Sequence, residues 1–114
     1  MIGNVEHEIQ VILLNLGIPT NLLGFLYLAY AMQLTLNGFE YITQVSKMLY
    51  VEVAEKYKTD PLSVERCIRH AIRTTFSHNL TDYAISLFGD NCKIPTNTQF
   101  ISRMYFHLIS QKEA

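Results

Sequence analysis

Apolar residues recur every three or four positions along most of the chain, which is the period of a helix that buries one face. The first such stretch covers residues 5–16, and Gly17 and Pro19 end it. The last begins after Thr96 and Asn97, which we expect to cap it. No stretch alternates apolar and polar residues over the length of a strand. The pattern predicts an all-α bundle of about six helices.

The most apolar segment, residues 22–36, has apolar side chains nearly all round a helix. A membrane span needs about 20 apolar residues, so this segment is too short to be one. Asn37 and Gly38 close it, and either Thr20 or Asn21 is expected to cap its start. We therefore expect a buried central helix and no membrane partner.

Two further helices have less certain limits. Residues 39–49 have helical spacing, with a bend expected near Leu49 and Tyr50. A short helix is predicted to start at Thr81 or Asp82, to continue to Phe88 and to be closed by Gly89.

The clearest start of a helix is at Asp60 and Pro61. Asp60 can accept hydrogen bonds from the first turn, and Pro61 fits the first helical position because its missing N–H costs nothing there. A shorter helical pattern ends just before Lys58 and Thr59. A short helix, a tight turn and a longer helix predict a helix-turn-helix at about residues 51–76, with residues 61–75 as the helix that enters the major groove of DNA.

The two faces of this second helix differ in chemistry. At about 100° per residue, Arg66, Arg69 and Arg73 fall within about 60° of one another. The opposite, packing face carries Val64, Cys67, Ile68, Ala71 and Thr75. Glu65 and Arg66 lie early enough in the helix to meet base edges.

The overall charge of the chain indicates that any affinity for nucleic acid comes from this one basic face. The 114 residues are 49% hydrophobic and 17% charged, as in a single folded domain of a soluble, cytoplasmic protein. The net charge is −1, so the chain as a whole has no basic field. The basic face must therefore supply the attraction to phosphates.

The remaining reactive residues do not form a recognisable catalytic or cofactor site. Cys67 and Cys92 lack the spacing of zinc ligands or of a disulfide framework, and we expect Cys67 to be a small buried side chain. His7, His78 and His107 also have no ligand spacing, and we interpret them as surface or capping residues. No paired carboxylates, activated nucleophile or phosphate-binding loop is visible, so we expect no enzyme, no metal and no cofactor.

Several motifs, in order over nearly the whole chain, resemble one family. It is the C-terminal DNA-binding effector domain of the master response regulator, a two-component protein, that initiates sporulation in endospore-forming Firmicutes. The motifs are L-G-I-P at 16–19, G-F-L-Y-L at 24–28, I-T-Q-V-S-K-M-L-Y at 42–50, V-E-R-C-I-R-H-A-I at 64–72, S-L-F-G at 86–89 and P-T-N at 95–97.

The resemblance implies a six-helix domain that regulates sporulation genes. Family members bind a short DNA box with a TCG core, commonly in tandem, and contact RNA polymerase. Residue by residue, Glu65 and Arg66 are implied to read base edges, while Arg69 and His70 contact bases or nearby phosphates. The chemistry agrees, because Arg binds guanine bidentately and Glu accepts from cytosine. Arg73 lies two turns further on and is expected to hold a phosphate.

The resemblance also bears on domain organisation. Residues 1–114 are expected to form one effector domain, without the receiver domain that full-length family members carry, monomeric when free and dimeric on DNA. An alternative is a helical protein-interaction module that keeps the fold but has lost specific DNA binding. It is favoured by the near-neutral charge and by apolar Ala29 and Tyr30, which stand where the family often has a charged pair.

Overall fold

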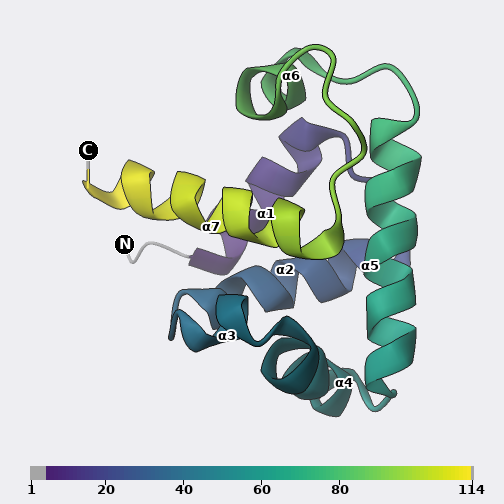
Figure 1. Cartoon of the computed structure of the whole chain (residues 1–114), viewed down its shortest axis with the longest axis vertical. Helices are drawn as coiled ribbons and strands as arrows, with labels where there is room; N and C mark the ends of the chain where they lie inside the picture. The colour runs from purple at the N-terminus through teal and green to yellow at the C-terminus, as the bar shows by residue number, and fades with distance from the viewer. Residues whose placement is uncertain (1–4, 114) are drawn as a thin grey trace.

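The computed structural model describes residues 5–113, which form seven α-helices and one π-helical segment and contain no strand (Figure 1). In chain order these are α1 (Val5–Leu16), α2 (Leu23–Thr35), α3 (Glu40–Thr43), the π-helical segment η1 (Val45–Leu49), α4 (Tyr50–Tyr57), α5 (Pro61–Phe76), α6 (Asp82–Phe88) and α7 (Asn97–Glu113). The all-α prediction is confirmed, with one helix more than the six or so expected. Residues 1–4 and 114 of the predicted domain lie outside the described part of the chain.

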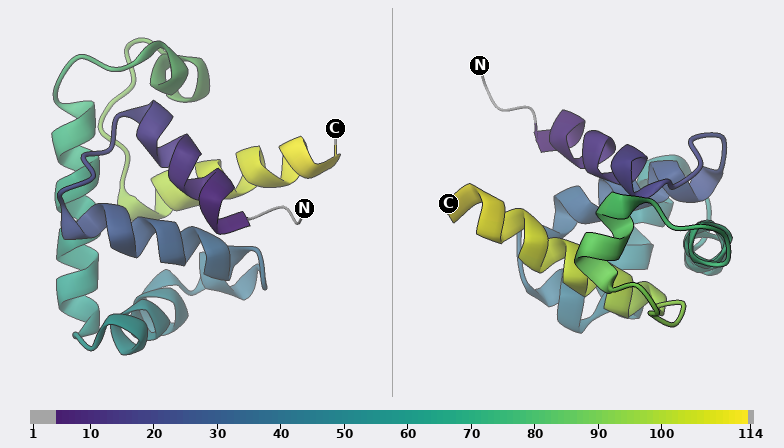
Figure 2. Two further views of the ribbon diagram at one scale, coloured as in Figure 1. Left: turned by 180° about the vertical axis from the view of Figure 1, so that it is seen from behind. Right: turned by 90° about the horizontal axis from the view of Figure 1, so that it is seen from above.

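Helix α2 is the centre of the core. It contacts α1, α3, α4, α5 and α7, and the left view of Figure 2 shows it crossing the molecule from α5. Its residues Leu28, Ala31 and Met32 have almost no exposed surface. The prediction of a buried central helix is therefore confirmed. Among residues 5–113, no helix combines the length and the apolar character that crossing a membrane requires.

The predicted cap of α2 is wrong. The N-cap residue is Leu22, in an extended conformation, and no side chain caps the helix. The Leu22 N–H donates to the Pro19 carbonyl over 3.4 Å, which places Thr20 and Asn21 in the middle of a turn. Neither side chain is therefore at the position from which it could reach the first turn of α2.

The bend in residues 39–57 also differs from the prediction. It lies at Gln44, whose φ of −131° and ψ of 55° separate α3 from η1, and not near Leu49 and Tyr50. Backbone conformation stays helical from η1 into α4. The wider π turn accommodates an extra residue. Leu49 and Tyr50, which are adjacent in sequence, are both buried.

The connection between α4 and α5 is only three residues long. Lys58 takes the left-handed conformation (φ 56°), and the Thr59 N–H donates to the Ala54 carbonyl at 3.0 Å. This is a Schellman motif, which ends α4 abruptly. Asp60 then caps α5 as predicted, accepting from the Ser63 N–H at 2.9 Å and from the Ser63 hydroxyl at 3.1 Å. The bond from the Ser63 backbone is the largest cause of the lowered pKa of the Asp60 carboxyl.

The last two helices close the core beside the end of α5. Thr81 caps α6, accepting from the Ala84 N–H at 3.0 Å, and Gly89 ends it with a φ of 94°. The rings of Phe76, Phe88 and Phe100, one from each of α5, α6 and α7, have centroids 5.0 to 6.2 Å apart. These aromatic side chains pack the ends of three helices together.

Candidate nucleic-acid interface

Helix α5 runs along one edge of the molecule (Figures 1 and 2) and buries only one face. The buried residues are Val64, Ile68, Ala71, Ile72, Thr75 and Phe76. The five predicted site residues lie on the opposite face; Arg66, Arg69, His70 and Arg73 are exposed and Glu65 is half-buried. At about 100° per residue their order round the helix is Glu65, Arg69, Arg73, Arg66 and His70, an arc of about 140°. Apart from Cys67, which is half-buried at the edge of the packing face and not fully buried as expected, the division into two faces agrees with the prediction.

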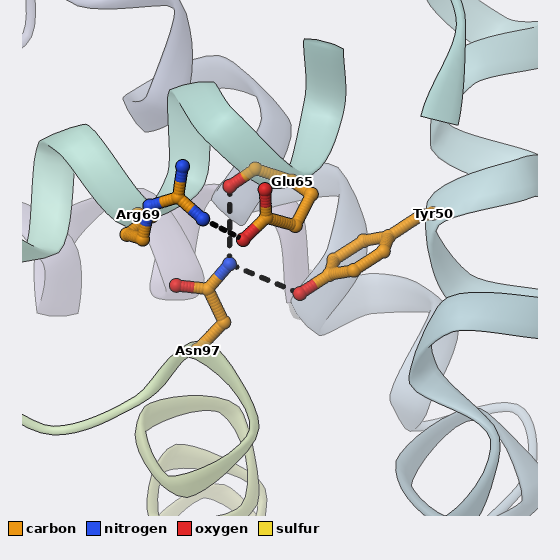
Figure 3. A network of polar contacts seen from close by, with 4 residues as sticks. All are labelled: Tyr50, Glu65, Arg69 and Asn97. Atoms are coloured by element: carbon orange, nitrogen blue, oxygen red, sulfur yellow. Dashed lines mark hydrogen bonds and ion pairs between the residues drawn. The ribbon is translucent and has the colours of Figure 1, made fainter. Parts of the chain in front are cut away.

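On one flank of this arc, Glu65 and Arg69 form an ion pair within the helix (Figure 3). The side chain of Arg69 is 46% exposed and that of Glu65 is 27% exposed. A pair of this kind on a helix surface is worth only about 0.3–0.5 kcal/mol. Either side chain can therefore exchange its partner for a group on DNA at little cost.

The same flank borders a hollow of about 410 Å³ between α5, η1 and the start of α7. Helix α5 contributes Glu65, Arg69 and Arg73, and the rest of the lining is Ser46, Tyr50, Ile94, Pro95, Thr96, Asn97 and Thr98. Two guanidinium groups against one carboxylate leave the hollow with a positive excess. It suits an anionic group such as a phosphate of the DNA backbone.

Asn97, the first residue of α7, joins the hollow to the core. It is 8% exposed, and its Nδ2 donates to the backbone carbonyl of Glu65 at 3.1 Å and to the hydroxyl of Tyr50 at 3.0 Å (Figure 3). Burial is the largest cause of the raised pKa of the Tyr50 hydroxyl. The expectation that Asn97 caps α7 is wrong, because Thr96 and Gln99 form the capping box instead, with bonds of 2.9 and 3.1 Å.

The other flank carries Arg66 and His70. Together with Cys67 they border a smaller hollow of about 290 Å³ at the start of α2, where the other lining residues are Asn21, Leu22, Leu23 and Gly24. Gly24 brings the two helices into backbone contact, because a Cβ on it would lie 2.3 Å from the Cys67 carbonyl oxygen. The structure therefore separates the five residues into a flank beside α7 and a flank beside α2.

Two histidines outside α5, His78 and His107, have structural partners. His107 lies 2.9 Å from the Tyr83 hydroxyl through Nε2, and His78 lies 2.7 Å from the Thr74 carbonyl through Nδ1. Cys67 and Cys92 are both free thiols. Within residues 5–113, no group of three or more His, Cys, Asp or Glu side chains could hold a metal ion.

Comparison with known families agrees with the resemblance seen in the motifs. The family model described as the C-terminal domain of the sporulation initiation factor Spo0A matches residues 9–108. The match extends from α1 into α7 and includes all five predicted site residues as well as Asn97. The family is the DNA-binding effector domain of a sporulation regulator, which is a transcription factor domain and not an enzyme.

Proposed function

The chain belongs to the family of Spo0A C-terminal domains, and from this membership we propose that it is a sequence-specific regulator of transcription. In this proposal, residues 1–114 act as one effector domain, residues 51–76 are the helix-turn-helix, and α5 enters the major groove of double-stranded DNA. The observation that carries it is the arc of exposed side chains on α5, a helix whose other face is fixed in the core.

The position of each side chain on the arc suggests its role. Arg66 lies in the second turn of α5 and points away from the core, so it is placed to bind guanine O6 and N7. Glu65 can accept from cytosine N4 once Arg69 has turned to a phosphate. His70 extends the Arg66 flank, and Arg73, further along the helix, is placed over the backbone of the duplex.

The wider setting is also part of the proposal. The regulated genes are of the sporulation type, and the domain, free as a monomer, binds tandem boxes as a dimer and contacts RNA polymerase. Two domains on the same face of a duplex would have boxes about one helical turn apart. Equal affinity for correctly and wrongly phased pairs of boxes would argue against contact between neighbouring domains.

Ala29 and Tyr30, two of the features that favoured a protein-interaction module, are packed against neighbouring residues. Ala29 is only 5% exposed. The ring of Tyr30 packs edge-on against Tyr57, with centroids 6.0 Å apart, and the Nζ of Lys56 lies 5.3 Å from its centroid. These two residues therefore offer little free apolar surface to a protein partner.

Substitution of Arg66 tests the proposal. If Arg66 binds guanine bidentately, Arg66→Ala should cost about 1 to 3 kcal/mol on a duplex with the TCG box and little on a scrambled duplex. Its effect on stability should stay within about 0.5 kcal/mol, because the side chain is exposed. The measurement is a pair of titrations at one salt concentration together with a thermal melt.

Two controls sharpen the result. Arg66→Lys keeps the charge but lacks the planar fork that matches guanine O6 and N7, so it should not fully restore the preference for the box. Arg103→Ala removes an exposed arginine from α7, and it should leave the preference unchanged. If Arg66→Ala melts normally and still prefers the box, Arg66 is not a base reader and the assignment of α5 to the groove fails.

A further inference from the structure

We propose that Asn97 is a positioning residue for DNA reading, which holds the turn of α5 that carries Glu65 against α4 and α7. The inference rests on the proposed function of α5. It concerns a residue that lies outside the helix-turn-helix and in our proposal touches no DNA itself.

The argument begins with the geometry of one side chain amide. Asn97 is buried at the start of α7, and its two amide hydrogens go to the Glu65 carbonyl in α5 and to the Tyr50 hydroxyl at the start of α4. A helical carbonyl accepts one bond from the N–H four residues later and has a second lone pair available. Asn97 therefore joins three helices without breaking a hydrogen bond of α5.

These two hydrogen bonds restrict rotation and sliding of α5, which its apolar contacts restrict less. Hydrophobic burial is non-directional, so it fixes how deeply α5 sits against α2 more firmly than it fixes rotation or sliding. A hydrogen bond to the backbone of Glu65 is directional and acts on the residue proposed to meet a base. The ion pair between Glu65 and Arg69 lies on the same side of the helix, so its position follows from the same bond.

Loss of the bonds should therefore affect discrimination between sequences more than overall attraction to DNA. Asn97 is buried and uncharged, so replacing it removes no phosphate contact, and the salt dependence of binding should not change. A misplaced Glu65 would bind the correct and incorrect bases more equally. We expect the ratio of affinities for cognate and scrambled duplexes to fall about threefold to tenfold, which is near or below the smallest loss expected when one base contact is removed outright.

The test compares four variants with the wild-type chain, using as cognate the tightest duplex selected from a random pool. Asn97→Ala and Asn97→Asp remove both bonds, since a carboxylate cannot donate, and Tyr50→Phe removes one while keeping the ring. Asn37→Ala is the matched control, because Asn37 is an exposed side-chain amide just after α2 and does not line this hollow. All titrations are made well below the lowest melting temperature. We expect the ratio of cognate to scrambled affinity to fall for both Asn97 variants, to fall less for Tyr50→Phe and to stay constant for Asn37→Ala.

A second comparison shows whether Asn97 acts through the base reader. In a Glu65→Ala background, adding Asn97→Ala should not reduce the ratio of cognate to scrambled affinity further, because the Glu65 side chain that Asn97 positions is already absent. If Asn97→Ala lowers the melting temperature but leaves the ratio intact, Asn97 is only structural and the inference is overturned. If Asn97→Ala does not fold, an unchanged ratio of cognate to scrambled affinity in Tyr50→Phe overturns the inference instead. A wild-type chain that fails to discriminate between the duplexes refutes the proposed function, and the inference with it.

Discussion

Gly24→Ala should destabilise the domain, because Gly24 is where α2 and α5 touch through their backbones. The added Cβ would lie 2.3 Å from the Cys67 carbonyl oxygen and 2.6 Å from the Cβ of Ala71. Both distances are far below van der Waals contact, and the oxygen belongs to the backbone of a helix. The variant can fold only if the two helices move apart.

The size of the effect follows from two opposing contributions. Overpacking a tight contact costs about 1–3 kcal/mol. Replacing a helical glycine by alanine gains up to about 1 kcal/mol, and less in the first turn where Gly24 lies. The net loss should be about 1–2 kcal/mol, which lowers the melting temperature of a domain of this size by about 4–8 °C.

The assay is a thermal melt of Gly24→Ala beside Gly38→Ala. The second variant is a matched control, because its Cβ would meet only the side chain carboxylate of Glu40, which is exposed and can move away. The turn of α5 displaced by Gly24→Ala carries Arg66, so the preference for the cognate duplex should also weaken at low temperature. If both variants melt like the wild type, the close contact between α2 and α5 is refuted.

Two further predictions concern the end of α5 and the turn of the helix-turn-helix. Arg73→Ala should weaken binding to all duplexes about equally and lower the salt slope by about one unit, and a changed base preference in the titrations would contradict the phosphate role. Lys58→Gly should raise stability by up to about 1 kcal/mol, because Lys58 holds a left-handed conformation that favours glycine. If thermal melts show that Lys58→Ala is stabilised as much as Lys58→Gly, the left-handed conformation of Lys58 is not the reason for the gain in stability.

Local signals predicted the start of α5, the end of α1 and both faces of the basic helix. Asp60 caps α5 through Ser63, three residues away, and Gly17 ends α1 with a φ of 90°. The separation of Arg66 and Arg69 from Val64 and Ile68 depends only on the helical period. Each of these features involves groups within about four residues of one another, the range over which side chains on one helix interact.

The same local reasoning failed where a distant element determined the outcome. Thr20 and Asn21 are good capping residues, but the turn after buried Ile18 leaves them out of position. From the sequence, Thr96 and Asn97 are equally good candidates to cap α7. Only Thr96 serves as one, because Asn97 is turned toward Tyr50 and Glu65.

The sequence of this chain is sufficient to predict its helices, its basic face and, through its motifs, its family. Tertiary packing decides how that face is divided, with Glu65 and Arg69 beside α7 and Arg66 and His70 beside α2. It also decides that Asn97 bonds to a residue 32 positions earlier in the chain. The physical reason is that helix period and capping depend on near neighbours, whereas the partner of a buried amide is chosen by the packing of the whole core.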